Sequence, residues 1–218
     1  MMPVLFENED VVVVAKPEGV ATIPGAPGDD LSVLARLEAE RGEKLYIVHR
    51  LDKDVSGVLL FARHADAHRF LNTQFESRQV HKTYLAAVQG GIREAEGVID
   101  APLREFGSGR VGVDEARGKP AVTRFEKVER LRKATLLHVY PLTGRRHQIR
   151  VHLYSISHPI LGDRRYGDKA EQSRFPRLML HALRLTFPLP SGETVTVEAP
   201  PPDSFESVMR RLALPNSQ

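Results

Sequence analysis

A chain of 218 residues with 41% hydrophobic side chains can fill a sizeable core, which excludes disorder along most of its length. The sequence contains no cysteine, so disulfides, thiol nucleophiles and cysteine-ligated zinc are excluded as well. Its apolar runs stay far below the ~18 residues of a membrane span, and its first ten residues lack the basic and apolar regions of a signal peptide. We therefore expect a soluble, cytoplasmic protein with no membrane partner.

Positive charge is concentrated in one part of the chain, although the formal net charge is only +3. Residues 1–49 carry four Lys or Arg against nine Asp or Glu, a net charge of −5, whereas residues 145–184 carry nine against three, a net charge of +6. Arg outnumbers Lys by 23 to eight, and guanidinium groups bind phosphates bidentately and stack on bases. The pattern favours a phosphate-bearing partner, while a codon bias toward Arg is the alternative explanation for the Arg share alone.

Apolar runs and alternating segments predict a sheet-rich chain. The expected strands are Val11–Ala15, Gly57–His64, Val80–Gly90, Ala121–Leu131, Ala134–Tyr140 and Thr194–Val197. Most of them follow one another without a regular crossover helix, which is typical of a mixed, largely antiparallel sheet. The sequence has no internal repeat and no linker long enough to separate two domains, so we expect one α+β domain over residues 1–218.

Helical spacing and capping residues predict four helices between these strands. The first runs from about Leu31, capped by Asp30, to Gly42, and the second carries Ala67, Phe70, Leu71 and Phe75 on one face. The third, Arg146–Ser157, is a basic amphipathic helix with Ile149, Leu153 and Ile156 on its apolar face. The last is capped by Asp203 and Glu206 and carries Phe205, Val208, Met209 and Leu212 on one face. The third helix is the expected centre of the basic segment.

Two short patterns resemble functional motifs but lack the context that those motifs need. The glycines of Gly107–Gly112 fit a dinucleotide-binding loop, yet the segment does not open a helix, so we interpret it as a hairpin turn. His64 and His68 have zinc-ligand spacing, but no third ligand is indicated. Neither a P-loop nor a serine nucleophile elbow is present, and we expect no metal and no cofactor.

The segment His49–Gly57 is a charged loop placed just before a buried apolar strand. In it Asp52 stands between Arg50 and Lys53, and flanking cations keep a carboxylate ionised and available as a nucleophile. A salt-bridged surface loop would have the same composition, so the residue types alone leave both interpretations open.

Five segments, in the same order along the chain, resemble the motifs of the RluA-type family of RNA pseudouridine synthases. In chain order they are Lys16-Pro-Glu-Gly19, His49-Arg-Leu-Asp52 with Val55-Ser-Gly57, Arg78 to Ala86, Thr143 to His152, and Pro159 to Gly167 followed by Leu180 to Leu185. Two positions depart from the family pattern: Val55 stands where Thr is usual, and Pro24 stands near a common His.

The resemblance implies a pseudouridine synthase fold, an isomerase activity on uridines in structured RNA, and Asp52 as the catalytic residue. Asp52 would act as a nucleophile at C1′ or as a base at C2′, and the sequence does not choose between these routes. Four further residues would bind the substrate. Arg50 would occupy the space that the flipped base leaves, Tyr84 would stack on that base, Arg150 would orient Asp52, and Leu180 would line the pocket. Arg150 as a phosphate-binding residue and Tyr84 as an ordinary core residue are the alternatives.

The basic segment is expected to follow the RNA backbone without reading its sequence. The side chains assigned to this surface are Arg145, Arg146, Arg164, Arg165, Arg174 and Arg177. The resemblance implies a compact, monomeric member without an S4 RNA-binding module, whose partner is ribosomal or transfer RNA. A non-catalytic RNA-binding protein and a carboxylate-based glycosidase are the competing functions.

Overall fold

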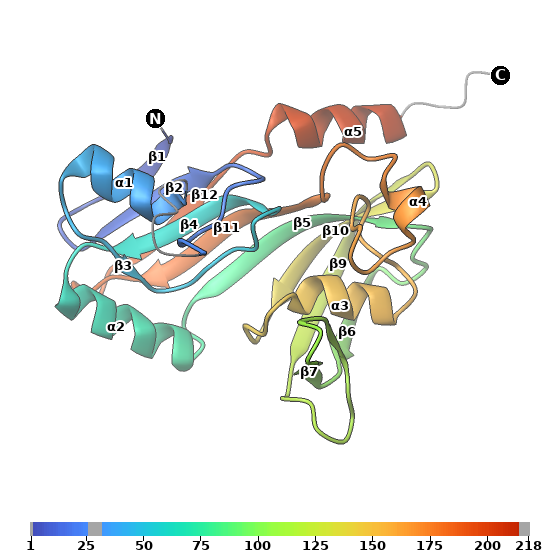
Figure 1. Cartoon of the computed structure of the whole chain (residues 1–218), viewed down its shortest axis with the longest axis horizontal. Coiled ribbons are helices and arrows are strands. Elements are labelled where there is room, and N and C mark those ends of the chain that lie inside the picture. The colour runs from blue at the N-terminus through green and yellow to red at the C-terminus, as the bar shows by residue number, and fades with distance from the viewer. Residues whose placement is uncertain (1, 26–31, 214–218) are drawn as a thin grey trace. The chain divides into compact units, whose positions relative to one another are not determined.

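The computed structural model describes residues 2–25 and 32–213, and it divides the chain into two compact units. The first unit contains residues 1–82 and 182–201, and the second contains residues 83–181 and 202–218 (Figure 1). Strands β5 and β11 each begin in one unit and end in the other.

Antiparallel pairing builds the first unit around a very apolar strand. Its strands are β1 (Val4–Glu7), β2 (Val11–Lys16), β3 (Tyr46–Ile47), β4 (Ser56–Ala62), most of β11 (Leu180–Pro188) and β12 (Thr194–Glu198). Strand β4 is buried at every position and pairs with β2 and β3, while β1 pairs with β2 and β12 with β11. A strand buried on both faces needs a continuous apolar sequence, which Val58 to Ala62 supply.

Two helices belong to the first unit, α1 (Val33–Arg41) and α2 (Ala65–Glu76). The predicted end of α1 at Gly42 is confirmed, because Gly42 adopts the left-handed conformation that favours glycine. The predicted N-cap is wrong: Ser32 caps the helix by accepting the Ala35 N–H at 3.2 Å, whereas Asp30 lies outside the described residues. Helix α2 buries Ala67 and Leu71 in the same apolar cluster as β4, as its spacing predicts.

The second unit has its own antiparallel ladder. Its strands are β5 (His81–Gln89), β6 (Glu96–Asp100), β7 (Leu103–Glu105), β8 (Val111–Val113), β9 (Val122–Leu131) and β10 (Ala134–Pro141). Strand β10 lies between β5 and β9, and β6 pairs with β9. Strands β7 and β8 form a separate hairpin, so the hairpin interpretation of Gly107–Gly112 is confirmed. The α+β class with a largely antiparallel sheet is also confirmed.

Three helices complete the second unit: α3 (Gln148–Ser155), α4 (Lys169–Gln172) and α5 (Asp203–Ala213). Helix α3 packs on β8, β9 and β10, and Figure 1 shows the β7–β8 hairpin directly below it. Helix α5 begins at Asp203 itself, so Asp203 and Glu206 lie in its first turn, where negative charge stabilises the helix dipole, rather than at a cap.

The prediction for the segment Arg146–Ser157 is wrong in its most important feature. Helix α3 is two residues shorter at each end and buries six consecutive residues, 148–153, so it has no basic, solvated face. Its cationic Arg150 and its His152 are buried, and Ile156 is the C-cap. Ile149 and Leu153 are buried as predicted, but Arg150 forms an internal pair, and the exposed Arg146 lies before the helix and pairs with Glu105.

Candidate active site

Asp52 lies in the loop that enters β4, with Arg50 exposed two residues before it. The Asp52 carbonyl accepts the Val55 N–H at 3.1 Å, which closes a tight turn, and the Asp52 side chain is half-buried. Val55 is fully buried, so the hydroxyl of the usual Thr would need a hydrogen-bond partner there. An apolar residue suits this position of the turn.

Thr22 holds the backbone immediately before Asp52. Its hydroxyl donates to the Leu51 carbonyl at 2.9 Å and accepts the Leu51 N–H at 3.1 Å. Both residues are buried, so these bonds replace water at both backbone polar groups of Leu51. The sequence analysis did not identify Thr22, because a single Thr in a Gly- and Pro-rich loop carries no pattern.

Lys16 holds the backbone immediately after Asp52. Its side chain is 2% exposed, and Nζ donates to the carbonyls of Pro17 (2.9 Å), Val20 (2.6 Å) and Lys53 (3.0 Å). The Lys53 carbonyl also accepts the Gly19 N–H at 2.9 Å. A buried ammonium satisfied by three carbonyls is a strong local constraint. The residues on both sides of Asp52, Leu51 and Lys53, are therefore held by Thr22 and by the last residue of β2.

Gly57, the second residue of β4, permits a close approach to the backbone of β11. It pairs with Lys16 across the ladder and has a φ of 121°, which side chains rarely tolerate. A Cβ atom at Gly57 would lie 2.1 Å from the Ala182 carbonyl oxygen, inside any possible contact distance. Only glycine fits at this position.

His49 is a neutral residue in the same loop. Its Nε2 accepts the Leu60 N–H at 3.0 Å, its ring stacks on Phe75 at 5.2 Å, and burial together with the charge of Lys82 lowers its pKa to about 3. Burial lowers the pKa of Lys82 to about 8. His49 therefore stays uncharged at neutral pH and supports β4 rather than exchanging protons.

Arg150 on α3 binds Asp163 through two parallel hydrogen bonds. Nε lies 2.8 Å from Oδ2 and Nη2 lies 2.9 Å from Oδ1. Asp163 also accepts the backbone N–H groups of Arg165 (3.0 Å) and Tyr166 (3.2 Å), so its carboxylate is fully engaged. This buried bidentate pair sets the plane of the Arg150 guanidinium. The sequence analysis missed Asp163 as its partner, and pairing of Arg150 with Asp52 stays a prediction.

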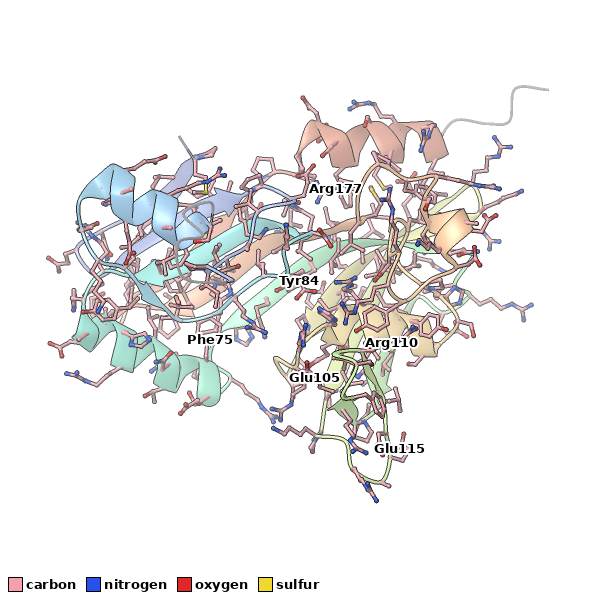
Figure 2. All side chains as sticks on the ribbon, viewed as in Figure 1. Phe75, Tyr84, Glu105, Arg110, Glu115 and Arg177 are labelled. Carbon is pink, nitrogen blue, oxygen red and sulfur yellow. The ribbon has the colours of Figure 1, made fainter. Side chains whose placement is uncertain are left out.

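Tyr166 connects Arg150 to the β7–β8 hairpin. Its buried ring lies 5.3 Å from the Arg150 guanidinium and 5.4 Å from that of Arg110, and its hydroxyl accepts the Val111 N–H at 3.2 Å. The same oxygen lies 2.7 Å from Nδ1 of His147. The phenol and the imidazole therefore share a hydrogen bond, and the Tyr166 oxygen joins the N-cap of α3 to the hairpin. Figure 2 shows Arg110 on this hairpin.

The remaining predicted substrate residues lie in the second unit. Tyr84 is half-buried on β5 opposite Val139 of β10, and Leu180 is buried as the first residue of β11 (Figure 2 labels Tyr84). Asp52 and Arg50 belong to the first unit. The roles assigned to these four residues stay predictions.

The predicted phosphate-contacting surface needs correction at one residue. Arg177 is 7% exposed, donates to the Leu178 carbonyl at 3.1 Å and to Ser204 at 3.1 Å, and lies over the Phe205 ring, so it is an internal residue (Figure 2). Arg146 pairs with Glu105, and Arg174 pairs with Glu171 at 3.1 Å. Ion pairs with neighbouring carboxylates weaken the attraction that these side chains offer to phosphate.

His64 and His68 have local partners. His64 caps α2 by accepting the Ala67 N–H at 3.3 Å and lies 3.1 Å from Asp10, and His68 contacts the Ile47 carbonyl at 3.0 Å. Within residues 2–25 and 32–213, no group of three or more His, Asp or Glu side chains is arranged as a metal site. In the same ranges, each helix is too short or too polar to cross a membrane.

Comparison with known proteins agrees with the site's motifs. The sequence profile described as RNA pseudouridylate synthase matches residues 10–155. Ribosomal large subunit pseudouridine synthase C of Pasteurella multocida is 41% identical over 221 residues, covering 96% of this chain and 67% of that protein. The corresponding Escherichia coli K12 protein is 39% identical, with 96% and 69% covered.

Solved structures give the same result for the fold. Human RNA Pseudouridylate Synthase Domain Containing 1 superposes with a TM-score of 0.82 at 28% identity, covering 100% of this chain and 97% of that one. The chain therefore belongs to the RNA pseudouridylate synthase family. It is an isomerase that acts on RNA, and the expected activity is confirmed over the non-catalytic and glycosidase alternatives.

Proposed function

We propose that this chain isomerises uridines of large-subunit ribosomal RNA, with Asp52 as its catalytic residue. The relatives named above act on the ribosomal large subunit, and they match nearly the whole chain at about 40% identity. The observation that carries the role of Asp52 is local: Thr22 and Lys16 hold the residues before and after it through three hydrogen bonds, two to Leu51 and one to the Lys53 carbonyl, while Asp52 itself is half-buried.

The reaction requires one well-oriented carboxylate and no redox group. The N1–C1′ bond of the uridine breaks, the uracil turns, a C5–C1′ bond forms, and C5 loses the proton whose equivalent N1 gains. Asp52 would stabilise or capture the electron-deficient sugar carbon, as carboxylates do in glycosidases. Fixing its backbone reduces the reorganisation that the reaction requires.

The other predicted residues would bind the flipped nucleotide. Tyr84 would stack on the uracil, Leu180 would line its apolar side, and Arg50, which is exposed, would fill the gap left in the RNA. Arg150, held in plane by Asp163, would orient the Asp52 carboxylate. We further propose that both units act as one catalytic domain, as a cytoplasmic monomer.

Tritium release tests this function directly. The substrate is large-subunit ribosomal RNA from a strain lacking the gene, labelled with tritium at uracil C5. We expect wild type and Asp54→Asn to release tritium and Asp52→Asn to release none; Asp54 is the matched control, an exposed carboxylate two residues away. Release by Asp52→Asn at the wild-type rate would overturn its role. Release only from transfer RNA would overturn the ribosomal substrate, and carbodiimide mapping would then identify the modified position.

A further inference from the structure

Five exposed cations gather at the end of the second unit where the β9–β10 turn meets the end of α5. We call this cluster the hairpin patch; its members are Arg130, Arg132, Lys133, Arg210 and Arg211. The Arg132 N–H donates to the Leu212 carbonyl at 3.1 Å, which joins the turn to the last turn of α5. Residues about 80 positions apart in the sequence therefore form one surface, which the sequence analysis did not predict.

Carboxylates neutralise little of this charge. Arg210 pairs with Glu206 at 3.2 Å, whereas the side chains of Arg132, Lys133 and Arg211 have no hydrogen bond or ion pair to any residue in the described ranges. The patch lies on two segments, residues 129–134 and the part of helix α5 that follows Asp203. These segments contain the five cations and two carboxylates, Glu129 and Glu206, so their net charge is about +3. Arg124, on the same strand β9, is different because it pairs with Glu96 and Glu126.

Local stability does not explain the whole patch. Cations in the last turn of a helix interact favourably with its dipole, which accounts for Arg210 and Arg211. Arg130, Arg132 and Lys133 are not part of a helix and repel those two arginines. A cluster of cations with so few carboxylate partners is the electrostatic signature of a polyanionic partner.

The hairpin patch lies well away from the predicted base-binding residue. Val139 faces Tyr84, and Ala134 follows the patch residue Lys133, so five residues of β10 separate the two positions. At about 3.4 Å per strand residue this is roughly 17 Å, a length that spans several base pairs of a duplex.

We propose that the hairpin patch binds the phosphate backbone of a duplex segment several base pairs from the target uridine. This inference rests on the proposed function, since it takes the substrate to be a structured RNA. The contact would position the RNA without reading bases. It would favour long or folded substrates over an isolated stem-loop.

The test compares two RNA hairpins that carry the uridine identified by carbodiimide mapping in their loop. The short probe has three base pairs next to the loop, and the long probe has twelve. The protein variant is Arg132→Ala/Lys133→Asn/Arg211→Ala; Asn is chosen because Lys133 has a φ of 54°. We expect the variant to lose about tenfold or more in affinity for the long probe, with a salt slope shallower by ~0.9 per lost phosphate contact. Affinity for the short probe and the saturated single-turnover rate should stay unchanged.

Arg124→Ala is the matched control, an exposed arginine of β9 that already has carboxylate partners. Equal affinity and salt slope of the triple variant and wild type on the long probe would overturn the proposal, as would equal losses on both probes. If the wild type forms no pseudouridine in ribosomal RNA, the proposed function fails instead. Loss of affinity for purified ribosomal proteins but not for the long probe would assign the patch to a protein partner.

Discussion

Asp163 determines how the guanidinium of Arg150 is presented. The two side chains are 0% and 7% exposed and share two N–H···O bonds of 2.8 and 2.9 Å. A planar fork on a planar carboxylate removes the rotational freedom that a lysine ammonium would keep. Since α3 is buried almost all round, Arg150 acts inside the protein and not on a solvated RNA-facing surface.

Arg150→Lys should therefore reduce the chemical step more than RNA binding. The variant keeps the charge but loses the two parallel bonds, and a misplacement of about 1 Å can cost ~10²-fold in rate. We expect the single-turnover rate at saturating enzyme to fall by about that factor, with Kd for RNA within about threefold of wild type. A changed Kd and salt slope with an unchanged rate would make Arg150 a phosphate-binding residue.

Tyr166→Phe should separate the two contacts of that side chain. Phe keeps the ring between Arg110 and Arg150 but leaves the Val111 N–H and His147 Nδ1 without their partner, at a site that is 2% exposed. Leaving such buried groups unsatisfied costs about 1–3 kcal/mol in the free energy of unfolding.

Urea denaturation measures that loss, and Tyr154→Phe is the control because Tyr154 is an exposed tyrosine of α3. We also expect Tyr166→Leu, which removes the ring, to lower the single-turnover rate further than Tyr166→Phe does. Equal rates for the two variants would show that ring stacking does not position Arg150.

Thr22→Val tests whether anchoring of the Asp52 loop matters for activity. The substitution keeps the shape and removes both bonds to Leu51, whose buried N–H and carbonyl then lack partners. We expect a loss of about 2–4 kcal/mol in unfolding free energy and a lower single-turnover rate. Thr22→Ser keeps the hydroxyl, so it should keep most of the unfolding free energy and most of the rate. A destabilised Thr22→Val enzyme with the full rate per folded molecule would mean that the loop needs no such anchoring.

Six of the twelve strands in the described residues could be predicted from the sequence, because apolar runs and alternation report burial directly, whereas β1, β3, β6 and β11 were missed. Val11–Ala15 and Ala134–Tyr140 are observed as strands with ends shifted by one residue. The environment of Asp52 could not be predicted, because it depends on hydrogen bonds from Lys16 and Thr22 that join segments about 30 residues apart. No local pattern encodes such contacts.

The electrostatic interpretation of the sequence was the least reliable step. Counting charges in residues 145–184 treated Arg150 and Arg177 as surface cations, but both are buried with internal partners. The hairpin patch was missed for the opposite reason, since its members come from two separated segments. Charge density along a chain does not distinguish solvated cations from buried ones.

Acid should destabilise both units through buried neutral histidines. Burial is the main cause that lowers the pKa of His49 to about 3, and burial also lowers the pKa of His152. The Nδ1 atom of His152 accepts from the Thr123 hydroxyl at 2.8 Å, and its Nε2 donates to the Ala101 carbonyl at 2.9 Å. In the unfolded chain both rings bind a proton near pH 6.5. Below that pH the unfolded state binds more protons than the folded state, so stability falls as the pH falls.

The measurement is urea unfolding between pH 7.5 and 5.5, a window above the titration of Glu43 and Asp114, whose pKa values arginine hydrogen bonds lower further. Each histidine can contribute at most about 1.4 kcal/mol per pH unit. His49→Gln and His152→Gln keep a neutral hydrogen-bonding side chain, so each should flatten the pH dependence even where it lowers stability at pH 7.5. Slopes identical to wild type in both variants would show that these rings accept protons in the folded protein and are not held neutral by burial.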